Sequence, residues 1–243
     1  KRPVRSKARG AVKIPASRQP LQRSHKRAPG SKFSVQAYAW QGQRSQSGDN
    51  SSSPGMIEVR IHGRGGQGNV VAAYLLATSA INEGWHAQAF PAFGAERRGA
   101  PVAAFVRIAH TPVRRRCQVV SPDFLIIQDS ALMNIPGITE GLKDDGSILL
   151  NSSKAPDNFT TGTGERLITL PATQLAQQYL GRPVPNTALL SAFLKLTDLL
   201  PLQSLIHSLE ERFKGAVLEK NIALIEAAAG TIAGNPWKTT VNA

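Results

Sequence analysis

The sequence predicts an α/β protein with a Rossmann-like, mostly parallel, doubly wound sheet followed by C-terminal helices. Three observations lead to this fold class. Short apolar runs alternate with segments of helical periodicity from Met56 to about residue 172. A glycine-rich stretch separates the first apolar run from the first helical segment. Only helical patterns follow Thr173.

The sequence pattern predicts strands that alternate with helices along the chain. The first strand, 56–62, leads into a helix over 69–83, and we expect Gly84 to cap that helix. The run 123–129 is apolar up to its last residues, which is typical of a central parallel strand. Further strands are expected at 85–90, 102–109, 147–153 and 166–172. Further helices are expected within 131–146 (a short helix and a turn), and at 174–180, 186–200, 202–213 and 215–230.

Residues 1–55 differ from the rest, and we expect a disordered basic tail there, ahead of a single domain at 56–243. The tail has 12 of the 29 Lys and Arg residues and one of the 16 Asp and Glu residues. Its one short apolar cluster cannot offset the entropy lost on ordering. Three origins stay open. The tail is foreign to a natural protein that starts at Met56, or it binds an acidic partner, or it is an organelle-targeting segment.

Charge and cysteine content exclude several functions. Subtracting the tail from the totals leaves 17 basic and 15 acidic residues, so a basic face for nucleic acid is not indicated. The single cysteine, Cys117, cannot hold an iron–sulfur cluster or form an internal disulfide, and it fits a cytoplasmic setting. No apolar run reaches the roughly 20 residues that span a membrane, so we expect no membrane partner.

The glycine-rich stretch is the first candidate binding site. Gly63, Gly65 and Gly68 satisfy the pattern G-x-G-x-x-G between a predicted strand and a predicted helix, and Gly66 leaves the turn still barer of side chains. Such a turn lets a phosphate approach the backbone amides at the start of the helix. The alternative is a tight strand-to-helix turn that binds no ligand.

A basic pair follows the second expected strand. An NAD or flavin site would carry an acid at the end of that strand, but the nearest acid, Glu83, ends the helix instead. Arg97 and Arg98 suit a ribose that bears a phosphate, as in NADP or coenzyme A. The alternative for Glu96–Arg98 is a solvated turn or an ion pair between subunits.

No catalytic set is apparent. The five histidines show no metal-ligand spacing, and Ser191 is not in the G-x-S-x-G turn of a hydrolase. Arg114–Arg116 precede Cys117, but a lone thiol on a strand is more often inert. We therefore expect neither catalytic residues nor a metal site in this chain.

Six collinear stretches of the sequence form a recognisable set. They are MIEVRIHGRGGQGNVVAAYLLA, QAFPAFGAERRGAPVAAFVRI, PDFLIIQDSALM, GLKDDGSILLNSS, PNTALLSAFLK and LEKNIALIEAA. GRGGQG alone is weak, but GRGGQG followed at this distance by ERRGAP is specific. Together the stretches resemble the gamma subunit of pyruvate:ferredoxin oxidoreductase, in the 2-oxoacid:acceptor oxidoreductase family. Ser191 stands where the family usually has glycine, which we expect to crowd a helix contact.

The resemblance implies a subunit that helps to bind coenzyme A while a complex oxidises pyruvate to acetyl-CoA and CO2. Alpha, beta and delta subunits would be its partners, ferredoxin or flavodoxin the electron acceptor. Thiamine diphosphate, Mg²⁺ and [4Fe-4S] clusters would lie on the partner subunits. The implied coenzyme-binding residues are Gly63, Arg64, Gly65, Gly66, Gln67, Gly68, Glu96, Arg97, Arg98, Gly99 and Asn186.

Two alternatives to this function stay open. One is a purely structural subunit of a related complex, for example one that oxidises 2-ketoisovalerate. The other is a free-standing NADP-dependent dehydrogenase, although the chain offers neither a second domain for a substrate nor an acid–base pair.

Overall fold

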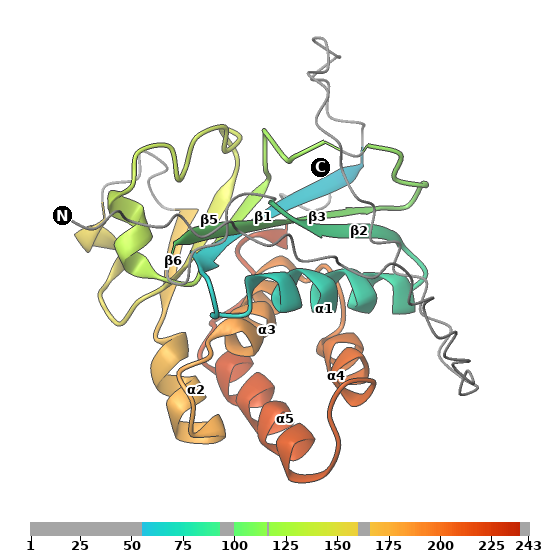
Figure 1. Cartoon of the computed structure of the whole chain (residues 1–243), viewed down its shortest axis with the longest axis vertical. Helices are drawn as coiled ribbons and strands as arrows, with labels where there is room; N and C mark the ends of the chain where they lie inside the picture. Colours follow the sequence, from blue (N-terminus) through green and yellow to red (C-terminus); the bar gives the residue numbers. More distant parts are fainter. Residues whose placement is uncertain (1–54, 93–99, 116, 160–165, 239–243) are drawn as a thin grey trace, which may run out of the picture. The chain divides into compact units, whose positions relative to one another are not determined.

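A computed structural model describes residues 55–92, 100–115, 117–159 and 166–238. They form a six-stranded sheet in the order β2-β3-β1-β4-β5-β6, with helices packed against it (Figure 1). The α/β fold class is confirmed, and the glycine-rich stretch does connect the first strand to the first helix. The strands are β1 Met56–Arg64, β2 His86–Pro91, β3 Pro101–Ala109, β4 Phe124–Ile127, β5 Ser147–Asn151 and β6 Leu167–Leu170.

The sheet is mixed. Strands β1, β4, β5 and β6 are parallel, whereas β3 runs antiparallel to both of its neighbours, β1 and β2. The antiparallel part arises because β2 and β3 follow each other as a hairpin instead of being joined by a crossover helix. Both ends of the connection between them, Ala92 and Ala100, therefore lie at the same edge of the sheet, where β1 ends.

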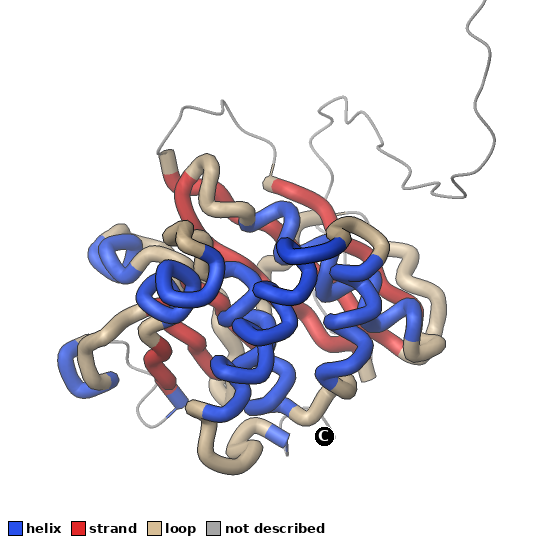
Figure 2. The backbone as a smooth tube through the Cα atoms, turned by 90° about the horizontal axis from the view of Figure 1, so that it is seen from below, coloured by secondary structure: helices blue, strands red, loops and turns tan. Residues whose placement is uncertain are grey.

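Five α-helices lie on one face of the sheet, which Figure 2 shows from the helical side. The expected doubly wound arrangement has α-helices on both faces; here the second face carries the short 3₁₀ helix η1 and connecting segments. The α-helices are α1 Asn69–Asn82, α2 Ala172–Leu180, α3 Asn186–Thr197, α4 Leu202–Glu210 and α5 Gly215–Gly230. The 3₁₀ helices are η1 Ser130–Asn134 and η2 Pro156–Asn158.

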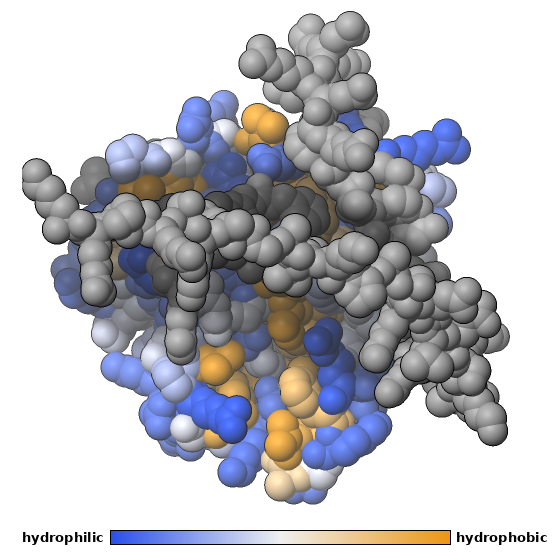
Figure 3. Space-filling view, in the orientation of Figure 1, coloured by the Kyte–Doolittle hydropathy of each residue, from blue (hydrophilic) through white to orange (hydrophobic). Residues whose placement is uncertain are grey.

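Alternation along the strands creates two hydrophobic cores. In β1, Val59 and Ile61 face the helices and join the larger core, while in β4, Leu125 and Ile127 face the second side and join the smaller one. Most of the described surface in Figure 3 is hydrophilic, with apolar residues gathered in its lower half, over the helices. The strands thus contribute residues to packing on both faces.

Hydroxyl groups fix the helices to one another. Ser79 of α1 and Ser208 of α4 share a hydrogen bond of 3.0 Å between their Oγ atoms, and both side chains are buried. The Ser191 hydroxyl donates to the carbonyl of Ile225 over 2.6 Å. Ser191 therefore links α3 to α5 by a buried hydrogen bond, and the crowding expected at this contact stays a prediction.

The second face of the sheet buries charged residues in β1 and β3. Arg107 is 1% exposed, and its Nε lies 2.7 Å from Oε1 of Glu58 on the neighbouring strand. Arg60 donates from Nη2 to the carbonyls of Ile138 and Glu140, at 3.1 and 2.7 Å. Burial lowers the pKa of Arg60. These guanidinium groups fasten connecting segments to the sheet.

Candidate functional site

The glycine loop between β1 and α1 is shaped by its glycines. Gly66 has φ 95° and Gly68 has φ 82°, in the left-handed region that side chains disfavour. A Cβ atom on Gly63 would overlap the side chain of Asn69. A Cβ atom on Gly68 would lie 2.8 Å from Nδ2 of Asn186, at the start of α3. The loop is therefore packed against the first residues of two helices.

Hydrogen bonds within the loop leave two backbone amides available. The N–H of Gln67 donates to the carbonyl of Arg64 over 3.1 Å, and Oε1 of Gln67 accepts from the N–H of Arg64 over 2.6 Å. Among the described residues, none accepts a hydrogen bond from the N–H of Gly66 or Gly68. These amides stand at the positive end of α1, where an anion is favoured.

An ion pair holds the loop to the neighbouring strand. Nε of Arg64 lies 2.5 Å from Oδ2 of Asp129, and both side chains are partly exposed. Asp129 is the second residue after β4, and its other oxygen accepts from the N–H of Ala131 and so begins η1. One carboxylate thus fixes both the glycine loop and the segment after β4.

The β2–β3 connection meets the glycine loop at its far end. The N–H of Gly65 donates to the carbonyl of Ala100 over 3.1 Å, and Arg64 pairs with Pro101 in the sheet register. Glu96, Arg97, Arg98 and Gly99, which were expected to bind the coenzyme, lie outside the described residues. Ala100 follows them directly, so the chain that carries the arginine pair returns to the sheet beside the glycine loop.

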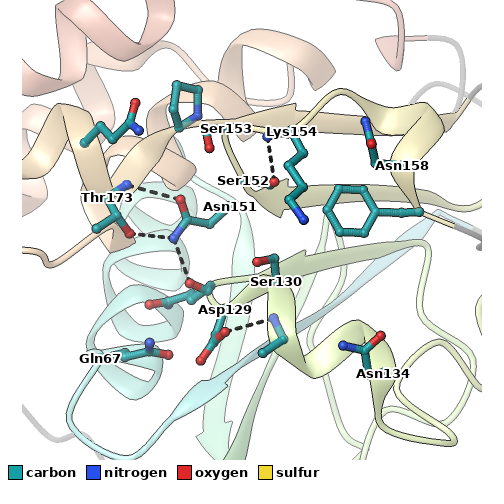
Figure 4. Close-up of a pocket in the computed structure, with 15 residues that line it drawn as sticks. Gln67, Asp129, Ser130, Asn134, Asn151, Ser152, Ser153, Lys154, Asn158 and Thr173 are labelled. Atoms are coloured by element: carbon teal, nitrogen blue, oxygen red, sulfur yellow. Dashed lines mark hydrogen bonds between the residues drawn. The ribbon is translucent and has the colours of Figure 1, made fainter.

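A cleft of about 720 Å³ opens on the other side of the loop, at the carboxyl ends of β4, β5 and β6. Figure 4 shows side chains from the ends of these strands and Gln67 of the loop around it. Ligands of α/β sheets commonly occupy this edge. The cleft is lined by Gln67, Gln128, Asp129, Ser130, Ala131, Asn134, Asn151, Ser152, Ser153, Lys154, Asn158, Phe159, Pro171, Thr173 and Gln174.

Asn151 organises the floor of the cleft. Its Nδ2 donates to the carbonyl of Gln128 over 2.8 Å and to Oγ1 of Thr173 over 2.7 Å, while Oδ1 accepts from the N–H of Thr173 (Figure 4). One carboxamide therefore connects β4, β5 and the first turn of α2. Its neighbour Gln128 is different, because both polar atoms of its buried side chain lack a partner within the described structure.

His62 lies directly before the loop and is held neutral. Burial, and to a smaller extent the charge of Arg60, lower the pKa of His62 to about 3. Its Nε2 is buried, and no described group hydrogen-bonds to it. His62 does not line the cleft. A neutral histidine therefore supports the end of β1 without adding charge beside the glycine loop.

The structure brings together Gly63, Arg64, Gly65, Gly66, Gln67, Gly68 and Asn186, and their binding of a coenzyme stays a prediction. Sequence reasoning missed Gln128, Asp129 and Asn151, although polar residues directly after parallel strands are a signal for this edge. The positions of Cys117, Glu83 and Gly84 also bear on what was expected from the sequence.

Cys117 was expected on a strand, but it lies exposed in the connection between β3 and β4. Its carbonyl accepts from Arg107, so the segment serves to hold that guanidinium. Glu83, which was judged unsuited to a ribose, is the C-cap residue of α1 and accepts a hydrogen bond from Ser204. Gly84 follows Glu83 with φ 82°, one residue beyond the cap that we expected it to form.

The described ranges contain no group of three His, Cys, Asp or Glu side chains that could hold a metal ion. Among the helices that the structure describes, none has both the length and the apolar character needed to cross a bilayer.

A glycine loop at the start of α1, beside a polar cleft at the carboxyl edge of the sheet, defines a Rossmann-like α/β protein. Comparison with known proteins narrows this class. The family described as pyruvate ferredoxin/flavodoxin oxidoreductase matches residues 58–231. The pyruvate synthase subunit PorC of Methanothermobacter thermautotrophicus is 49% identical over 166 residues, which cover 68% of this chain and 90% of that protein.

Two further relatives agree. The common gamma subunit of the pyruvate/ketoisovalerate oxidoreductases of Thermococcus kodakarensis is 44% identical, over 71% of this chain and 95% of that protein. The crystal structure of pyruvate oxidoreductase subunit PORC from Thermotoga maritima has a TM-score of 0.66 at 34% identity, and covers 72% of this chain and 96% of that one. The chain belongs to the gamma subunits of the pyruvate ferredoxin/flavodoxin oxidoreductase family, as the sequence motifs had indicated.

Proposed function

We propose that this subunit binds coenzyme A for a complex that oxidises pyruvate to acetyl-CoA and CO2 and reduces ferredoxin or flavodoxin. In this proposal alpha, beta and delta subunits carry the thiamine diphosphate, Mg²⁺ and [4Fe-4S] clusters. The names of the relatives support the reaction, since they are subunits of pyruvate synthase and of pyruvate/ketoisovalerate oxidoreductases.

The observation that carries the coenzyme proposal is the hydrogen bond between Gly65 and Ala100. It anchors Ala100, directly after the segment that contains Arg97 and Arg98, next to the amides of Gly66 and Gly68, which donate to no described residue. A pyrophosphate suits amides at a helix start, and a phosphorylated ribose suits a pair of guanidinium groups. Coenzyme A carries both groups on one ribose, a phosphate on the 3′-oxygen and the pyrophosphate on the 5′-oxygen.

The chemistry of the residues at the glycine loop fits coenzyme A. The glycine loop has no side chain at Gly66 or Gly68 to keep a phosphate from the backbone, and α1 adds the favourable end of its dipole. In the proposed mechanism, Arg64 and Asp129 keep the loop in place, and the loop orients the pyrophosphate. The arginine pair fixes the ribose phosphate. When bound, coenzyme A supplies the thiol that accepts the acyl group. This chain therefore acts by positioning that thiol.

The test uses the assembled complex with Arg97→Ala and Arg98→Ala combined. We expect the KM for coenzyme A to rise at least 10-fold, because two charge-assisted contacts are lost, while decarboxylation of pyruvate without coenzyme A is unchanged. The matched control removes two exposed arginines that do not line the cleft, Arg182 and Arg212, and leaves both activities as in the wild type.

Other outcomes favour the alternatives. An equal loss of both activities in the Arg97 and Arg98 variant, with partner subunits dissociating, would mean that the pair serves assembly, as in a purely structural subunit. Binding of NADPH in competition with coenzyme A, and no effect of the variant on acyl transfer, would support a dehydrogenase site.

A further inference from the structure

Gln128 lines the cleft, and its buried side chain lacks hydrogen bonds within the described structure. Its backbone is satisfied, because its N–H donates to the carbonyl of His62 and its carbonyl accepts from Asn151, each over 2.8 Å. The side chain is 1% exposed, yet no described group bonds to its Nε2 or its Oε1. Burying an amide without partners is unfavourable. At the cleft wall, the buried carboxamide of Gln128 would need to turn outward to meet a ligand that brings both an acceptor and a donor.

The cleft itself is polar but nearly free of charge. Its lining contains six carboxamide side chains, including Gln128, and four hydroxyl side chains. Its charged residues are Lys154 and Asp129, and the carboxylate of Asp129 is already paired with Arg64. A phosphate group normally requires several cations or free backbone amides. The lining therefore favours a neutral ligand with several hydrogen-bonding groups.

The sheet order places the glycine loop between this cleft and the β2–β3 connection. Strand β1 has β3 on one side and β4 on the other. Ala100, directly after the arginine segment, lies by the loop on the β3 side, whereas the cleft lies at the ends of β4, β5 and β6. A pyrophosphate at the loop would divide the coenzyme into two parts that leave in these two directions.

We propose that the cleft receives the neutral, amide-bearing arm of coenzyme A and that Gln128 hydrogen-bonds that arm; this inference rests on the proposed function. The arm contains two secondary amides, each with a carbonyl and an N–H. Nε2 of Gln128 donates to an amide carbonyl of the arm, and Oε1 accepts from an amide N–H. The phosphorylated ribose leaves the loop on the β3 side, toward Ala100.

The test measures binding of two ligands to the assembled complex by calorimetry: coenzyme A, and adenosine 3′,5′-bisphosphate, which lacks the arm. Gln128→Met keeps the volume and removes both polar groups. We expect it to weaken coenzyme A about 10-fold and to leave the bisphosphate unchanged, because a lost hydrogen-bond pair in a buried site has about that effect. The control Gln178→Leu changes an exposed glutamine of α2 outside the cleft and affects neither ligand.

A stability measurement separates binding from a structural role. Since the Gln128 carboxamide has no partner within the described structure, Gln128→Met should keep or raise the melting temperature. A lower melting temperature with unchanged affinity would show that the amide binds internal water, and would overturn the inference. If Gln128→Met does not fold, Gln128→Asn, which retracts the amide by one methylene, is used with the same two ligands.

Further outcomes of the binding measurements distinguish failure of this inference from failure of the proposed function. An equal loss of affinity for both ligands in Gln128→Met would place the adenosine end in the cleft and overturn the inference, while the coenzyme site would stand. The combined Arg97→Ala and Arg98→Ala variant should weaken both ligands. If the wild-type complex binds neither ligand, or the arginine variant changes neither, the proposed function fails instead.

Discussion

Nδ2 of Asn186 lies 2.8 Å from the position that a Cβ atom on Gly68 would take. Asn186 is the first residue of α3, and Gly68 directly precedes α1. Oδ1 of Asn186 accepts from the N–H of Thr187 over 2.8 Å, so the side chain is held at the helix start. Position 68 thus requires glycine for two separate reasons, its positive φ and the close approach of α3.

Replacing Gly68 by alanine tests both reasons. We expect Gly68→Ala to lower the free energy of unfolding by about 2–4 kcal/mol, the sum of a left-handed alanine and an overpacked contact. Gly66→Ala is the matched control, since Gly66 also has positive φ but has nothing within 4 Å of its would-be Cβ atom. It should lose only about 1–2 kcal/mol. Equal losses in urea denaturation would show that Asn186 moves aside freely.

Breaking the ion pair between Arg64 and Asp129 should affect binding more than stability. Asp129→Asn keeps an oxygen that can accept from Ala131 and removes the charge that holds Arg64. Because the pair is partly exposed, we expect the free energy of unfolding to change by less than about 1 kcal/mol. Affinity for coenzyme A should fall several-fold through a less ordered loop. Asp198→Asn, in the exposed pair with Lys238, should leave that affinity unchanged.

Removing Arg107 should destabilise the chain strongly. Arg107→Met leaves the carboxylate of Glu58 buried without its partner, which costs about 3–5 kcal/mol. Thermal and urea unfolding of the purified chain measure this loss. Lys238→Met removes a cation from an exposed pair and should leave stability nearly unchanged. A similar small loss for Arg107→Met would mean that water reaches Glu58.

The neutral state of His62 makes stability depend on pH. Its pKa is about 3 in the folded chain, against about 6.5 when unfolded, so the unfolded state binds more protons between these values. The contribution of His62 to the free energy of unfolding therefore falls as pH decreases below 6.5, by about 2 kcal/mol at pH 5. Unfolding of the wild type and of His62→Gln is compared from pH 7.5 to pH 4.5.

The difference in free energy of unfolding between the wild type and His62→Gln should change by about 2 kcal/mol as the pH is lowered to 5. His207→Gln serves as the control, because His207 is exposed on α4, and its curve should run parallel to that of the wild type. A constant difference between wild type and His62→Gln would show that His62 is hydrated in the folded chain.

Local patterns were sufficient to predict most elements. The run 215–230 was expected to be a helix, and α5 has those bounds. The glycine loop was located because its signal lies within a few residues, between a strand and a helix. Periodicity depends on neighbours in the chain, and therefore it predicts where a helix or strand lies better than which strands pair.

Features that depend on distant residues were not predicted. The antiparallel placement of β3 depends on its pairing with β1, and apolar strands such as 102–109 give no signal for direction. The links from Asn151 to Thr173 and from Arg64 to Asp129 join residues 22 and 65 positions apart. The unpartnered state of Gln128 arises from what surrounds it after folding, which a single sequence does not express.

The hairpin of β2 and β3 also bears on how this family can change. Both ends of the 92–100 connection are fixed by the sheet, at Ala92 through Ala103 and at Ala100 through Gly65. Its residues can therefore be exchanged without altering the order of the strands or the packing of the helices. Under the proposed function, a graft of this connection between relatives would transfer the arginine pair as a unit and leave the cleft beyond β1 intact. Selectivity for the two ends of a ligand can thus evolve separately in a single small domain.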